Sequence, residues 1–142
     1  MNSTCVDIRK AILAMPMART LRLQFDHVGP GEVRLRMPAL HAFCFRPGQL
    51  QATAIYAIAD FAAVGAAGTL LPSGWINATI DGTLKLLTPA IGSCLRAEGR
   101  VIAAQRLLTV CAADVYAVDG DKETLCATLL ATARNIEPKA PR

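Results

Sequence analysis

The chain has 142 residues, of which 53% are apolar and 18% are charged, and its formal net charge is +4. This composition excludes intrinsic disorder and predicts one domain over residues 1–142 with a sizeable buried core. The Lys and Arg residues form no run, so the sequence offers no patch for nucleic acid.

The five cysteines are widely spaced, and no Cys-x-x-Cys pair occurs among them. Such spacing argues against a zinc site or a redox dithiol, and the two histidines lie in unrelated contexts. We therefore expect reduced cysteines, no metal, no cofactor and a cytoplasmic location. The first residues carry Asp7, Arg9 and Lys10 without an uninterrupted apolar run, which argues against a secretory leader.

The N-terminal third changes from helical to strand periodicity. Residues 4–18 have apolar residues at helical spacing, and Pro16 ends or kinks that helix. Residues 21–26 and 33–37 then alternate between apolar and polar around Gly29-Pro30-Gly31, which predicts a β-hairpin. Residues 39–49 show no periodicity and are predicted to be a loop.

A long apolar helix is predicted over residues 50–65. The run 52–71 has the length of a membrane span, but Asp60 lies near its middle, where a charge costs about 2.5–3.5 kcal/mol on insertion scales. We therefore interpret it as a helix wrapped on most sides inside a soluble domain, with no membrane contact.

Four further strands are predicted over residues 76–86, 95–101, 107–118 and 123–133, followed by a disordered tail over about 137–142. In the first of them one face carries Ile76, Ala78, Ile80, Leu84 and Leu86, and the other carries Asn77, Thr79, Asp81, Thr83 and Lys85. The elements together predict an α+β protein, in which an antiparallel six-stranded sheet wraps around one long central helix. This is the hot-dog arrangement.

Three stretches resemble the hot-dog acyl-CoA thioesterase superfamily, in particular the phenylacetate-degradation type. The run from Gly48 to Asp60 is similar to the family's central-helix motif, with Ala52 at its small position. Residues 84–92 resemble the family's strand that ends in Pro before a Gly turn, and residues 97–101 resemble the next strand. The family's His is Gln51 here, and its loop Asn falls near Phe45.

The resemblance implies an acyl-CoA substrate and a homodimer, or a dimer of dimers (homotetramer). Thioester hydrolysis needs a carboxylate that attacks the thioester or activates water, and a donor for the developing oxyanion. Asp60 is the candidate carboxylate, and the helix N-terminal amides of Ala52 and Thr53 are the candidate donors. The alternative for Asp60 is a structural carboxylate that bonds a buried Arg, the backbone or water, or that lines a hydrated dimer interface.

Three further side chains are candidates for substrate contact. The amide of Gln51 is placed to orient the acyl carbonyl or to serve as a solvated helix cap. Arg96 and Arg100 have the forked geometry that suits the phosphates of coenzyme A, although solvated charge is the ordinary role of arginines on a polar strand face. Two other functions remain open, namely a non-catalytic module that binds acyl-CoA and a structural dimer.

Overall fold

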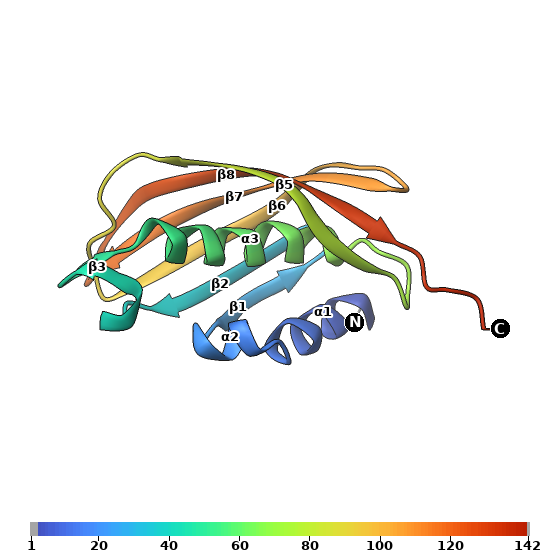
Figure 1. The fold of residues 1–142 in the computed structure, drawn as a ribbon, viewed down its shortest axis with the longest axis horizontal. Coiled ribbons are helices and arrows are strands. Elements are labelled where there is room, and N and C mark those ends of the chain that lie inside the picture. Colours follow the sequence, from blue (N-terminus) through green and yellow to red (C-terminus); the bar gives the residue numbers. More distant parts are fainter. Residues whose placement is uncertain (1–2, 142) are drawn as a thin grey trace.

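The computed structural model describes residues 3–141, and its main feature is a curved antiparallel sheet that covers one side of a long helix (Figure 1). The six strands lie in the order β1-β2-β6-β7-β8-β5. This is the α+β, hot-dog architecture that the sequence predicts. The elements are α1 (Ser3–Leu13), α2 (Pro16–Thr20), β1 (Gln24–Gly29), β2 (Glu32–Pro38), β3 (Cys44–Arg46), β4 (Gln49–Leu50), α3 (Ala52–Gly68), β5 (Ile76–Leu86), β6 (Cys94–Ala104), β7 (Leu108–Asp119) and β8 (Lys122–Ile136).

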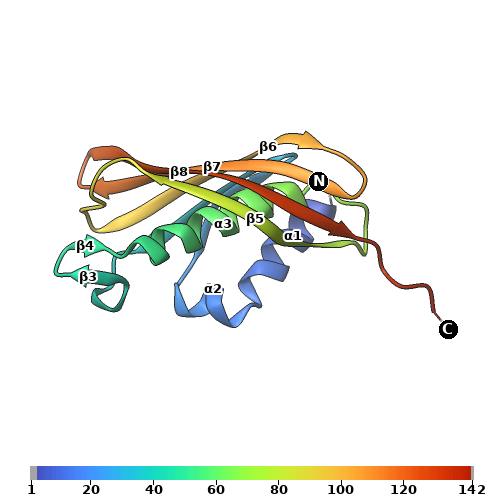
Figure 2. The same cartoon turned by 45° about the horizontal axis from the view of Figure 1, so that its top comes forward.

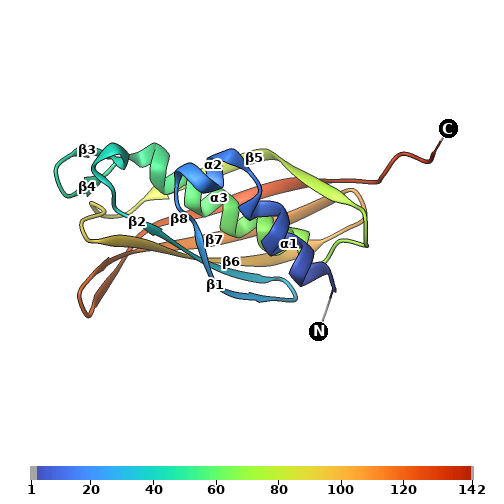
Figure 3. The same cartoon turned by 90° about the horizontal axis from the view of Figure 1, so that it is seen from below.

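The N-terminal segment forms two helices where the sequence predicts one. Met15 is extended, with ψ at 132°, and Pro16 begins α2. The proline ring disfavours helical backbone at the residue before it, so α1 does not continue through Met15 but ends at Leu13, and α2 starts anew. Both helices lie on the side of α3 that faces away from the sheet (Figures 2 and 3). The predicted loop over 39–49 contains a short 3-10 turn and the two-stranded hairpin β3–β4.

Small side chains let α3 lie close to the sheet. The face of α3 against the sheet is largely alanine, and Gly99 of β6 lies directly beneath the carbonyl group of Ala62. The C-terminal part of α3, around Gly65 and Gly68, is covered by α1. A third stripe of α3 remains half-buried, and it consists of Tyr56, Ala57, Asp60, Phe61 and Val64. Among the helices of residues 3–141, none combines the length and the apolar character that crossing a bilayer requires.

The strand β5 differs from the sequence prediction in which side chains face the helix. Asn77 and Thr79 point toward α3, whereas the alternation assigned them to one face with Asp81 and Thr83. The pairing of β5 with β8 shifts between Thr79 and Asp81, which leaves Ile80 as the extra residue of a β-bulge. Because one inserted residue reverses the alternation, Asp81 faces outward although it lies two positions after the inward-facing Thr79.

Candidate functional site

Asp60 and Thr79 form a hydrogen-bonded pair between the middle of α3 and the edge strand β5. The Thr79 hydroxyl donates to Oδ1 of Asp60 at 2.8 Å, and both side chains are half-buried. Burial raises the pKa of the Asp60 carboxyl above its ordinary value, and the Thr79 hydrogen bond opposes that rise. No other hydrogen bond or ion pair holds the Asp60 side chain within the described residues, so its second oxygen is available to a substrate or a water.

Sequence reasoning missed Thr79, since the alternating pattern assigned it to the polar strand face with Asp81. It also missed Tyr56, which lies four residues before Asp60 and therefore on the same stripe of the helix. The Tyr56 hydroxyl lies over Gly82 of β5, where any side chain would overlap it. Burial, followed by the charges of Asp60 and Asp81, raises the pKa of Tyr56, so its phenol stays protonated. The spacing of four from Asp60 is the signal that would have found it.

The start of α3 carries the other predicted site residues. Gln51 is the N-cap, but its exposed side chain makes no capping hydrogen bond. The amides of Ala52 and Thr53 donate to no group within the described residues, as is usual for the first turn of a helix. Ala52, together with Gln51, borders a hollow of about 410 Å³ whose other walls include Phe45 and Leu87.

One chain does not bring Asp60 and the helix start together. Thr53 and Ala52 precede Asp60 by seven and eight residues, which corresponds to about 10–12 Å along the helix axis. A thioester carbonyl is far shorter than that separation. A single thioester therefore cannot contact both Asp60 and the helix-start amides of the same protomer.

Arg96 and Arg100 lie on the face of the sheet opposite α3. Arg96 pairs with Glu98 and with Glu123, and its guanidinium lies 4.4 Å from the centre of the Tyr116 ring. Arg100 pairs with Asp114 at 3.1 Å. Their neighbours Leu95, Ala97 and Gly99 point to α3, so the two arginines are separated from Asp60 by the sheet. Contact of these arginines with coenzyme A stays a prediction.

A cavity of about 510 Å³ opens beside Asp60 and Thr79. It extends along α3 toward Leu71 and Trp75, between α1 and the first half of β5. Its lining is apolar side chains or glycine except for Asp60, Thr79, Asn77 and Ser73. An apolar cavity with one convergent carboxylate is the usual form of a binding site for a small molecule.

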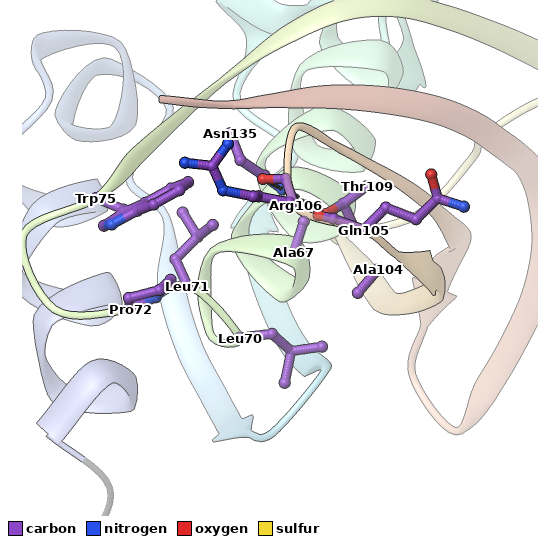
Figure 4. A pocket seen from close by; sticks show the side chains of 10 residues that line it. All are labelled: Ala67, Leu70, Leu71, Pro72, Trp75, Ala104, Gln105, Arg106, Thr109 and Asn135. Carbon is purple, nitrogen blue, oxygen red and sulfur yellow. Dashed lines mark hydrogen bonds between the residues drawn. The ribbon is translucent and has the colours of Figure 1, made fainter. Parts of the chain in front are cut away.

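A second hollow, of about 320 Å³, lies at the C-terminal end of α3 (Figure 4). Its buried polar residues are Thr109 and Asn135, and Nδ2 of Asn135 donates to the carbonyl oxygens of Gln105 and Arg106 and to Oγ1 of Thr109. These bonds hold the turn between β6 and β7, and they leave no donor of that amide for a ligand. We assign this hollow a structural role.

Two of the four cysteines whose side chains the structure describes have the environment of buried structural thiols. Cys111 and Cys126 are buried, and burial raises the pKa of Cys111 to about 11. Cys44 and Cys94 are half-buried and unbridged, and the side chain of Cys5 lies outside the described residues. Within the described part of the chain, no three His, Cys, Asp or Glu side chains come together as they do around a metal ion.

Among known proteins, the chain is similar to several whose structures have been solved. No protein-family model and no curated protein sequence matches the chain. A thioesterase family protein from Silicibacter pomeroyi is similar over 92% of this chain and 96% of its own, with 29% identity and a TM-score of 0.89.

Two more distant structures share the fold. A phenylacetic acid degradation-related protein from Ralstonia eutropha JMP134 has 24% identity and a TM-score of 0.79, and the match covers 93% of this chain and 99% of that one. A thioesterase from Haemophilus influenzae has 18% identity and a TM-score of 0.82, covering 96% of this chain and 92% of that one. The predicted resemblance to the hot-dog thioesterases is thus confirmed.

Proposed function

We propose that this chain, whose solved relatives include thioesterases of the hot-dog fold, hydrolyses the thioester bond of an acyl-CoA. The observation that carries the proposal is the half-buried Asp60, held by Thr79 on the wall of an apolar cavity. Burial makes the Asp60 carboxylate costly to ionise, and a carboxylate on the surface would not have that cost. A carboxylate kept in such a position is a typical catalytic group.

Asp60 acts as general base or as nucleophile in this proposal. As a base, its free oxygen takes a proton from water while the water oxygen attacks the thioester carbon; the collapse of that adduct expels the thiolate, which takes the proton. As a nucleophile, the same oxygen attacks the carbon, expels the thiolate and leaves an acyl anhydride that water hydrolyses. In both routes Thr79 is a positioning residue, because its hydroxyl orients the carboxylate.

The oxyanion donors come from a second copy of the chain. The amides of Ala52 and Thr53 have the right chemistry, and Gln51 beside them is placed to orient the acyl carbonyl, but all three are too far from Asp60 of their own protomer. In a two-fold symmetric dimer each helix start can approach the partner's carboxylate. The site we propose is therefore shared between two protomers of a homodimer, or of a dimer of dimers.

We expect the dimer to form through β5. This strand is an edge of the sheet, and Ile80 on it is 57% exposed. An unpaired edge with exposed apolar side chains favours pairing with another chain. Sedimentation equilibrium at micromolar concentration should give a dimer or tetramer, and Ile80→Lys should shift the protein toward monomer.

Ile102→Lys is the matched control for this experiment. Ile102 is 55% exposed but belongs to β6, which β7 and β8 separate from β5 in the sheet. A monomeric wild type would contradict the shared site, and equal dissociation of both variants would show that β5 is not the contact.

The pH dependence of hydrolysis should report Asp60. Only the ionised carboxylate can accept a proton or attack, so kcat/KM falls as acid protonates it. Because burial raises its pKa, this fall should begin above the ordinary carboxyl value of 3.8. Steady-state rates between pH 4 and 8, with circular dichroism to confirm the fold at each pH, measure it. A rate that stays constant down to the ordinary carboxyl range would contradict the assignment.

The second candidate function is a non-catalytic module that binds acyl-CoA. Gln51 and Phe45 favour it, because they replace the His and the Asn of the resembling family, and neither side chain is a base. A panel of acyl-CoA esters separates the two functions. Release of free coenzyme A thiol supports the hydrolase, whereas a raised melting temperature without release supports the binding module. A protein that shows neither response is a structural dimer.

A further inference from the structure

The cavity beside Asp60 has few polar groups in an otherwise apolar wall. Asp60 and Thr79 form one part of that wall, and Asn77, whose Nδ2 donates to the carbonyl oxygen of Val64 at 3.0 Å, lies further along it near Gly68. Beyond them the walls are hydrocarbon and glycine, apart from Ser73 and the indole of Trp75. A ligand that matches this cavity has a reacting polar group at one end and an apolar body.

The helix α1 gives the cavity a wall in a defined place. Ile12 and Ile8 of α1 pack against Gly65 and Gly68 of α3, where a side chain larger than hydrogen would meet the isoleucine methyl groups. The two glycines therefore let α1 lie directly on α3, and Ala11 and Met15 complete the wall. The position of the cavity wall on this side therefore depends on where α1 lies.

The position of Asp60 at one part of the cavity orients the substrate. The cavity extends from Asp60 along α3 to Gly68, away from the helix start of the same protomer. From Asp60 to Gly68 the helix rises about 12 Å, which is the length of a medium-chain acyl group. An acetyl group would leave most of the cavity unfilled.

We infer that this cavity is the acyl subsite, that it takes a medium-chain apolar acyl group, and that α1 sets the length it accepts. The inference rests on the proposed function for its substrate. Burial of each added methylene stabilises the bound acyl group. The wild type should therefore hydrolyse octanoyl-CoA with a kcat/KM at least about tenfold higher than that for acetyl-CoA.

Ala11→Phe tests the inference, because Ala11 is exposed on the cavity wall and its replacement fills the cavity without disturbing the core. We expect the ratio of kcat/KM for octanoyl-CoA over acetyl-CoA to fall about tenfold or more. Val64→Phe, from the opposite wall, should act in the same direction. Ala14→Phe is the matched control, since Ala14 is also exposed, lies three residues further on and does not line the cavity. Its ratio should equal that of the wild type.

A binding measurement separates failure of the subsite from failure of the hydrolase. In the Asp60→Asn background, which keeps the thioester intact, octanoyl-CoA should raise the melting temperature more than free coenzyme A does. Ala11→Phe in that background should abolish the difference between the melting-temperature rise with octanoyl-CoA and the rise with free coenzyme A. This result supports the subsite even if the wild type hydrolyses nothing. An unchanged acyl-length ratio in an active Ala11→Phe enzyme, or a melting-temperature difference that survives the substitution, would overturn the subsite and leave the hydrolase standing.

Discussion

Asp60→Asn should reduce acyl-CoA hydrolysis by about a hundredfold or more, which is the lower range of what loss of a general base costs. The amide keeps the shape of the carboxylate and still accepts the Thr79 hydrogen bond through its oxygen. It lacks the charge that deprotonates water or attacks the thioester. The affinity for acyl-CoA should persist, because the carboxylate acts in the transition state. Thiol release under single-turnover conditions measures the loss.

The same substitution should leave the fold at least as stable as the wild type. Burial raises the pKa of Asp60 above its value in the unfolded chain, so the ionised form costs stability at neutral pH. That cost disappears as the pH falls through the raised pKa toward the unfolded value, and asparagine does not incur it at any pH. A melting temperature that drops sharply, with turnover per folded molecule unchanged, would instead make Asp60 a structural carboxylate.

Asp114→Asn provides a control that shares one feature of the Asp60 site. Asp114 is half-buried and accepts a hydrogen bond from the Thr128 hydroxyl at 2.9 Å, as Asp60 does from Thr79, but it also pairs with Arg100 at 3.1 Å. It lies on the outer sheet face, away from the cavity beside Asp60. Its substitution should leave the hydrolysis rate at saturating substrate at the wild-type level. Equal losses in the two variants would show that the effect is not specific to the Asp60 site.

Gly99→Ala should destabilise the protein by about 3 kcal/mol, the upper part of the usual range for overpacking. A methyl group at this position would overlap the backbone carbonyl of Ala62, and neither the helix nor the strand can move aside alone. For a chain of this length, such a loss lowers the melting temperature by about 10 °C. Denaturant unfolding and differential scanning calorimetry measure both quantities.

Gly82→Ala tests whether the cost of an added methyl group depends on how easily the neighbouring atoms can move. Here too an added methyl group would overlap a neighbour, but that neighbour is the hydroxyl end of Tyr56. A side-chain tip can rotate away, so we expect a loss below about 1 kcal/mol. If Gly99→Ala melts close to the wild type, the contact between α3 and the sheet is looser than the structure indicates.

Local patterns in the sequence were enough to predict the elements and their order. The alternation of residues 33–37, the Gly-Pro-Gly turn before them and the long apolar run predict a hairpin and a buried helix, because each depends on neighbours within a few positions. The same reasoning identified Asp60, since one carboxylate in an apolar helix is visible without any tertiary information. The pattern thus determined the hot-dog arrangement and the candidate carboxylate.

Only the tertiary structure decided what surrounds that carboxylate. The bulge at Ile80 turns Thr79 toward Asp60, and a shift of pairing by one residue leaves no trace in a strand where polar and apolar residues alternate. The packing of α3 on the face of β6 that carries Leu95 and Ala97 likewise leaves Arg96 on the other face, separated from Asp60 by the sheet. The cavity exists because α1 packs on α3 through two glycines, a contact between segments more than fifty residues apart. Bulges, faces and cavities depend on which distant elements meet, and the spacing of residues along one segment does not encode that.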